Sequence, residues 1–151
     1  MTACFTGHRI IEQDRALEIT QKLSKTIEAL IERGVKNFRS GGAIGFDTVA
    51  ALKVIEYKEK YPDIKLHMLL PCREQTKGWN EYCIRVYEYI LSHADEIVYI
   101  SEHYYSGCMH ARNRALVNGS DVCVAYCTNE RSGTYYTLSY AKKSGLEVVL
   151  I

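Results

Sequence analysis

The sequence lacks the features that would assign it at once to several common protein classes. Its formal net charge is only +1, so there is no strong excess of basic side chains for bulk nucleic-acid binding. No hydrophobic run is long enough to span a bilayer. The chain has neither a G-x-G-x-x-G segment nor a P-loop with its Lys-Ser/Thr pair, which disfavours a standard dinucleotide site and a Walker-type site.

The cysteines do not form any standard metal or redox motif. The six cysteines are Cys4, Cys72, Cys83, Cys108, Cys123 and Cys127. None of them forms a C-x-x-C pair, and we expect free thiols, several of them buried. His103, Cys108 and His110 do not have the spacing of a zinc site. We therefore expect no bound metal, and nothing in the sequence calls for a cofactor.

What the sequence does contain is a regular alternation of short apolar runs and amphipathic segments. The apolar runs predict strands, and the segments with helical spacing predict helices. Continuous apolar strands are typical of a parallel sheet covered on both faces. We therefore predict an α/β fold, a Rossmann-like doubly wound and mainly parallel sheet with helices on both faces, in a single domain over residues 1–151. The expected strands are 3–6, 35–40, 64–70, 95–100, 121–126 and 147–151, and the expected helices are 12–33, 46–60, 79–92, 109–117 and 134–143.

In such sheets the ligand lies beyond the carboxyl ends of the strands. The segment after the second strand contains Ser40, Gly41, Gly42, Gly45 and Asp47. Glycines let the backbone approach a ligand closely, and the start of the following helix attracts anions. Asp47 either complements the helix dipole or accepts hydrogen bonds from ribose hydroxyls. The alternative is that these glycines form only a tight turn.

The start of the last helix has the same character. Ser132, Gly133 and Thr134 offer hydroxyl and backbone N–H groups that can hold a phosphate, and residues 131–146 contain no acidic side chain. The alternative is that a hydroxyl in this segment only caps the helix.

Three further segments follow strands or open a helix. Gly7, His8 and Arg9 follow the first strand, where Arg9 can pair with a phosphate and His8 can donate or exchange a proton. Pro71 follows the third strand. On helix 109–117, Arg112 and Asn113 are candidates to face the same ligand. The alternative for these residues is a solvated turn and a solvated helix face.

Together these segments resemble the SLOG superfamily of Rossmann-like domains, which includes DprA-like and LOG-like proteins, and within it the small YpsA-like branch. The resemblance covers nearly the whole chain. It rests on the order and spacing of four segments, Thr6-Gly7-His8-Arg9, Ser40 to Asp47, Met109-His110-Ala111-Arg112-Asn113 and Ser132 to Thr137.

LOG-like enzymes are phosphoribohydrolases that cleave the N-glycosidic bond of a nucleoside monophosphate. The resemblance maps their active-site arginine onto Arg112 and their Gly-Thr pair onto Gly133 and Thr134. Their catalytic glutamate falls on Thr137, which cannot ionise. Asp47 and Glu130 are the nearest substitutes, so Arg112, Asp47 and Glu130 are the catalytic candidates if the protein is an enzyme.

These observations lead to three hypotheses. The first is a module that senses or sequesters a nucleotide-type, phosphate-bearing small molecule such as an NAD- or ADP-ribose-derived signal. The second is a LOG-like nucleoside-monophosphate N-glycosidase, and the third is a DprA-like accessory of DNA processing. We expect a cytoplasmic protein that forms a homodimer or larger homo-oligomer and has neither nucleic acid nor membrane as partner. The sequence leaves open the ligand's identity, its turnover, the number of subunits and any downstream partner.

Overall fold

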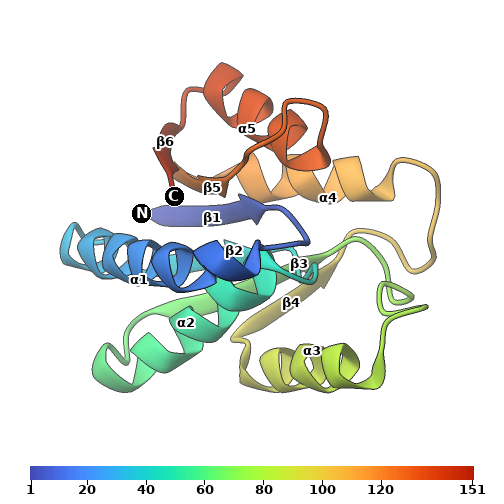
Figure 1. The fold of residues 1–151 in the computed structure, drawn as a ribbon, viewed down its shortest axis with the longest axis horizontal. Helices are drawn as coiled ribbons and strands as arrows, with labels where there is room; N and C mark the ends of the chain where they lie inside the picture. Colours follow the sequence, from blue (N-terminus) through green and yellow to red (C-terminus); the bar gives the residue numbers. More distant parts are fainter.

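Six parallel strands form the centre of the fold, and a computed structural model describes all of residues 1–151 (Figure 1). The strand order is β4-β3-β2-β1-β5-β6. Every neighbouring pair is parallel, and Cys4 of β1, for example, lies opposite Arg39 of β2 and Cys123 of β5. The strands are β1 (Thr2–Gly7), β2 (Asn37–Ser40), β3 (Lys65–Leu70), β4 (Glu96–Tyr99), β5 (Val122–Tyr126) and β6 (Glu147–Leu150).

The helices cover both faces of this sheet. Helices α1, α2 and α3 lie on one face, and α4 and α5 lie on the other (Figure 1). This division follows from right-handed crossover connections. The connections from β1 through β2 and β3 to β4 run in one direction along the sheet and place α1, α2 and α3 on one face. The connections from β4 through β5 to β6 run in the opposite direction and place α4 and α5 on the other face. The helices are α1 (Ala16–Glu32), α2 (Phe46–Lys60), α3 (Glu81–His93), α4 (Cys108–Val117) and α5 (Gly133–Lys143).

The core is divided by the sheet into two apolar clusters. Helix α1 contributes Ile19, Leu23, Ile27 and Leu30 to the larger cluster, at the spacing that places side chains on one helix face. Leu138 of α5 belongs to the smaller cluster on the opposite face. Burial on both faces explains why all five residues of β5 are buried and why its sequence is a continuous apolar run.

The structure confirms the predicted fold class, with small differences at helix starts. The first helix was expected from residue 12, but a single 3-10 turn over Gln13–Arg15 precedes α1. Helix α3 begins at Glu81 because the side chain of Asn80 accepts a hydrogen bond from the Cys83 N–H (2.8 Å) and caps the helix.

The direction of the connections reverses between β1 and β5, which are neighbours in the sheet. Loops that leave two such strands diverge to opposite faces, and this opens a crevice at their carboxyl ends. The segments after β1, β2 and β5 therefore meet at one edge of the sheet, as the sequence predicted. None of the helices combines the length and hydrophobicity that a membrane span requires.

Candidate functional site

A cavity of about 240 Å³ lies at the carboxyl ends of β1 and β5. Most of the predicted site residues line it. They are Gly7, His8, Arg9, Asp47, Arg112, Asn113, Ser132, Gly133 and Thr134, joined by Thr6, Ala43 and Met109, which were not predicted. We call this the switch-point cavity.

Arg112 is the buried cation of the switch-point cavity, and only 5 % of its surface is exposed. Its Nη1 donates a hydrogen bond to the carbonyl oxygen of Gly41, and its Nε donates one to Asn113 Oδ1 (2.8 Å). Burial lowers the pKa of Arg112, and the charge of Asp47 opposes this effect. Because a guanidinium stays protonated in proteins, the cavity contains a fixed positive charge.

Asp47 lies in the first turn of α2 and is also only 5 % exposed. Its Oδ1 is the only fully buried side-chain nitrogen or oxygen without a hydrogen-bond partner. Burial raises the pKa of Asp47 to about 6, although the charge of Arg112 pulls it down. An unpaired buried carboxylate oxygen is costly, and no group of the chain donates a hydrogen bond to Asp47 Oδ1 to offset this cost.

The N-terminus of α5 forms another wall of the switch-point cavity. The Ser132 Oγ accepts a hydrogen bond from the Tyr135 N–H (3.1 Å), so Ser132 caps the helix. The N–H groups of Gly133 and Thr134, in the first turn, have no acceptor within the helix. Apart from the adjoining backbone, no atom lies within 4 Å of the position that a Cβ at Gly133 would occupy. The capping and binding interpretations are therefore compatible.

His8 joins the ends of β1 and β5. Its Nε2 accepts a hydrogen bond from the Thr128 N–H (2.7 Å), and its ring meets the Tyr126 ring edge-on at 5.5 Å between centroids. Burial lowers the pKa of His8. The accepted hydrogen bond places the remaining ring proton on Nδ1, so the neutral side chain is a donor at that atom.

Other predicted residues do not line the switch-point cavity. These are Ser40, Gly41, Gly42, Gly45 and Pro71. Ser40 Oγ donates a hydrogen bond to the Asp47 carbonyl oxygen (3.1 Å). Gly42 has φ +74°, and a Cβ there would lie 2.6 Å from a Leu70 methyl group, so the backbone packs against the core at this point.

Glu130 and Thr137, which the resemblance to LOG-like enzymes singled out, do not line the switch-point cavity. Glu130 is exposed and lines neither the switch-point cavity nor the larger cavity described next. Thr137 is buried, and its Oγ1 donates a hydrogen bond to the Gly133 carbonyl oxygen (3.0 Å) within α5. Of the two carboxylates considered, only Asp47 is therefore at the site. No three or more His, Cys, Asp or Glu side chains are grouped as metal ligands.

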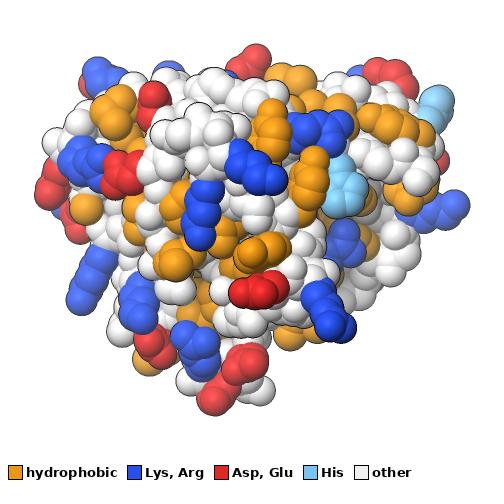
Figure 2. Space-filling model, turned by 90° about the horizontal axis from the view of Figure 1, so that it is seen from above, with side chains coloured by type: hydrophobic (Ala, Val, Ile, Leu, Met, Phe, Trp, Pro, Cys, Tyr) orange, Lys and Arg blue, Asp and Glu red, His pale blue; other side chains and the backbone are white.

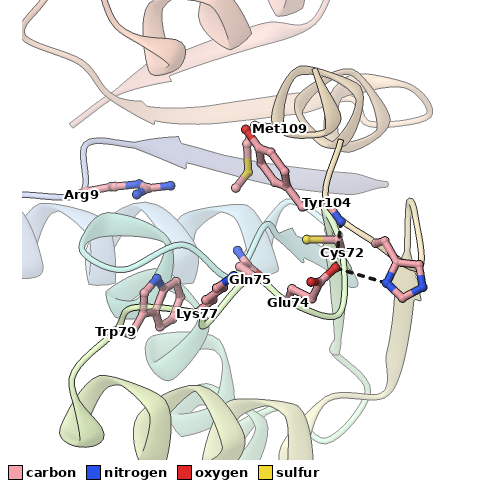
Figure 3. Close-up of a pocket in the computed structure, with 9 residues that line it drawn as sticks. Arg9, Cys72, Glu74, Gln75, Lys77, Trp79, Tyr104 and Met109 are labelled. Carbon is pink, nitrogen blue, oxygen red and sulfur yellow. Dashed lines mark hydrogen bonds and ion pairs between the residues drawn. The ribbon is translucent and has the colours of Figure 1, made fainter. Parts of the chain in front are cut away.

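A second and larger cavity of about 580 Å³ adjoins the first (Figure 3). Arg9 and Met109 line both cavities. The other walls come from the segments that follow β3 and β4, and they are Cys72, Glu74, Gln75, Lys77, Trp79, His103 and Tyr104. The sequence analysis did not predict that these side chains line a cavity. One feature of the sequence did point to this segment, since Trp79 is the only tryptophan and follows the third strand. We call this the Trp79 cavity.

Comparison with known families identifies the chain. The YpsA family model, described as the YspA SLOG family, matches residues 4–147. The chain belongs to the YpsA SLOG family. The resemblance seen in the sequence is thereby confirmed.

Curated relatives of this YpsA-family protein come from Bacillus. A UPF0398 protein of Bacillus thuringiensis (strain Al Hakam) is 32 % identical over 130 residues, which are 84 % of this chain and 71 % of the relative. The SPbeta prophage-derived protein YoqJ of Bacillus subtilis (strain 168) is 34 % identical over 143 residues, or 86 % of this chain and 84 % of YoqJ. YoqJ is described as uncharacterized.

Two solved structures share the fold at low sequence identity. DNA processing protein A from Helicobacter pylori, described by its single-stranded DNA binding mode, aligns with a TM-score of 0.71 and 20 % identity over 99 % of this chain and 64 % of its own. DprA from Streptococcus pneumoniae aligns with a TM-score of 0.74 and 20 % identity over 99 % of this chain and 49 % of its own. The YpsA-family chain thus spans less than two thirds of either structure.

The outer surface of α4 and α5 mixes hydrophobic and basic side chains. Figure 2 looks onto the molecule from this side and shows hydrophobic side chains interspersed with Lys and Arg. Tyr135 and Tyr136 of α5 are 37 % and 36 % exposed. The Tyr136 hydroxyl accepts a hydrogen bond from Arg114 (3.0 Å), so part of this surface is already paired within the chain. Self-association of the chain stays a prediction.

Proposed function

We propose that this YpsA-family protein binds a nucleotide-type, phosphate-bearing small molecule in the switch-point cavity. The observation that supports this most is the meeting of three groups in one cavity, the buried Arg112 guanidinium, the unpaired Asp47 Oδ1 and the N-terminus of α5. The Arg112 guanidinium and the N-terminus of α5 favour an anionic group, whereas the Asp47 oxygen accepts hydrogen bonds from hydroxyl groups. Together they fit a ligand that has both an anionic group and hydroxyl donors.

The anionic part of the ligand belongs at the N-terminus of α5. The partial positive charge of the helix end and the N–H groups of Gly133 and Thr134 stabilise a phosphate there. Arg112 and Arg9 line the same cavity and add positive charge. A charge-assisted hydrogen bond of an arginine to phosphate is worth roughly 1.5–3 kcal/mol.

Asp47 selects a different part of the ligand. A fully ionised phosphate has no proton to donate, whereas a ribose hydroxyl does, and Asp47 Oδ1 lacks a donor. We infer that the ribose lies against Asp47 and the phosphate against α5. NAD- and ADP-ribose-derived molecules have this combination, so the function we propose is sensing or sequestering such a ligand in the cytoplasm.

Titration calorimetry with defined probes tests the proposal. We expect ribose 5-phosphate, AMP and ADP-ribose to bind with one-to-one stoichiometry, and adenosine to bind at least tenfold more weakly than AMP. Arg112→Ala is expected to weaken AMP binding by roughly ten- to a hundredfold, because it removes a charge-assisted hydrogen bond.

The matched control is Arg114→Ala, on the same helix, since Arg114 is exposed and lines neither cavity. Thermal unfolding of each variant shows whether it is folded. Failure of the wild type to bind any phosphate-bearing probe, or equal loss of binding in both arginine variants, would overturn the proposal.

One observation favours an enzyme as the alternative. The pKa of Asp47, raised to about 6 by burial, suits proton transfer near neutral pH. An N-glycosidase would release free base from nucleoside monophosphates or NAD-derived molecules. Chromatographic detection of robust turnover by the wild type, lost in Asp47→Asn and retained in Glu130→Gln, would replace the binding module by this alternative.

The fold of this chain matches that of a protein described by its single-stranded DNA binding mode. This match weakens the expectation that the chain binds no nucleic acid, and it makes DNA a competing candidate ligand. A short single-stranded oligonucleotide therefore belongs among the calorimetric probes. Competition of this oligonucleotide with AMP would place both ligands at the same cavity. Binding of the oligonucleotide alone, with no binding of AMP, would favour the DprA-like alternative.

A further inference from the structure

The Trp79 cavity is a separate compartment that the phosphate and ribose contacts do not occupy. Its volume of about 580 Å³ lies within the range of cavities that enclose small organic ligands. It adjoins the switch-point cavity, because Arg9 and Met109 line both. In Figure 3, Trp79 lies on the side of α3, and Met109 lies across the cavity on the side of α4.

A chain of contacts connects the two cavities. The Trp79 ring packs edge-on against the Tyr87 ring, with 5.5 Å between centroids. The Tyr87 hydroxyl donates a hydrogen bond to Gln75 Oε1 (3.1 Å), and Gln75 Nε2 donates one to the Gly41 carbonyl oxygen (3.1 Å). Arg112 donates to that same carbonyl oxygen. These contacts therefore link the aromatic wall of one cavity to the guanidinium of the other.

The Trp79 cavity has charges of both signs. Glu74 brings a carboxylate into it, Lys77 brings an ammonium group, and Arg9 stands at the side shared with the switch-point cavity. The Glu74 carboxylate accepts hydrogen bonds from the Tyr104 N–H (3.0 Å) and the His103 ring (3.2 Å), so it is held in place. A fixed carboxylate repels phosphate but accepts hydrogen bonds from an amino group on a ring. Trp79, Tyr104 and Met109 provide aromatic and thioether surfaces against which a planar ring can pack.

Building on the proposed function, we propose that the ligand is a two-part molecule that spans both cavities. Its ribose phosphate lies in the switch-point cavity, and its heteroaromatic base lies in the Trp79 cavity against the indole ring. The ligand class is thus a nucleoside 5′-phosphate or its diphosphate derivatives rather than a plain sugar phosphate. Glu74 is positioned to accept a hydrogen bond from the base.

Fluorescence of the wild-type protein provides a direct test, because Trp79 is the only tryptophan. AMP is expected to change the tryptophan emission on binding, since its base contacts the indole. Ribose 5-phosphate is expected to bind without this change. An identical emission change with both probes, or none with AMP, would contradict the proposed position of the base.

Calorimetry of Trp79 variants tests the position of the base separately from the binding of the phosphate. Trp79→Ala is expected to weaken AMP binding by roughly five- to a hundredfold, the range for loss of one base–aromatic stack, and to leave ribose 5-phosphate binding within twofold. Trp79→Phe, which keeps a ring, is expected to recover most of the affinity for AMP. Tyr82→Ala is the control, since Tyr82 is 75 % exposed on the neighbouring α3.

The possible failures are distinguishable. If the wild type binds neither probe, the proposed function fails. If it binds both and Trp79→Ala weakens neither or both equally, the phosphate site stands and the base site is wrong.

Discussion

At the scale of single residues, the arrangement of Asp47 is explained better by binding than by stability. Its Oδ1 is buried without a partner, and burial raises its pKa to about 6. A carboxyl group whose pKa is higher in the folded than in the unfolded state holds its proton more tightly when folded. Ionisation of Asp47 therefore costs stability as the pH rises from about 4 through about 6. The cost persists at neutral pH.

We predict that Asp47→Asn removes this pH dependence. With a tenfold change in proton affinity equal to 1.36 kcal/mol, a pKa increase from 3.8 to about 6 corresponds to about 3 kcal/mol. The free energy of unfolding of Asp47→Asn, relative to the wild type, is expected to rise by up to this amount between pH 4 and pH 7. Urea unfolding across this pH range measures the difference.

The control for this prediction is Asp63→Asn, because Asp63 is exposed. Its stability relative to the wild type is expected to change little over the same range. A constant difference between Asp47→Asn and the wild type from pH 4 to pH 7 would show that Asp47 is not held in the environment described here.

At the scale of elements, two strand-to-helix connections have different roles. The sequence predicted that the glycines after β2 and the segment before α5 both approach the ligand. In the structure, Gly133 lines the switch-point cavity beside open space, whereas Gly42 packs against Leu70 with φ +74°. Sequence shows where glycines occur, but whether a glycine faces a ligand or the core depends on tertiary packing, which a local pattern does not contain.

Gly42→Val is therefore predicted to destabilise the fold. A β-branched residue at this φ is strained, and its Cβ would lie 2.6 Å from a Leu70 methyl group. These two effects together are expected to lower the free energy of unfolding by roughly 2–5 kcal/mol. Chemical denaturation measures this loss. A Gly42→Val protein as stable as the wild type would mean that the loop after β2 rearranges freely.

At the scale of the whole molecule, the sequence predicted the parallel sheet, and the structure confirms it. This prediction succeeded because the alternation of apolar runs with helical segments, together with the handedness of the connections, determines which segments share an edge of the sheet. The ligand-binding role of the residues at that edge stays a prediction. The contact of Arg112 with the Gly41 carbonyl oxygen and the Trp79 cavity were not predicted. The hydrogen bond and the cavity depend on where side chains from segments far apart in sequence point. The spacing of apolar residues along the chain contains no information about these directions.

The central claim is that a phosphate-bearing ligand binds at the carboxyl ends of β1 and β5. Gly133→Val tests it most directly, because Gly133 lines the cavity and a Cβ at this position would enter open space. The variant is expected to unfold within about 2 °C of the wild type, a difference of less than about 1 kcal/mol for a chain of this size.

The decisive measurement is calorimetric titration of AMP into the wild type and Gly133→Val. The account predicts saturable binding by the wild type and at least tenfold weaker binding by the variant, since the valine occupies the place of the phosphate and covers the free N–H groups of α5. Equal affinity of the two folded proteins for AMP would contradict it.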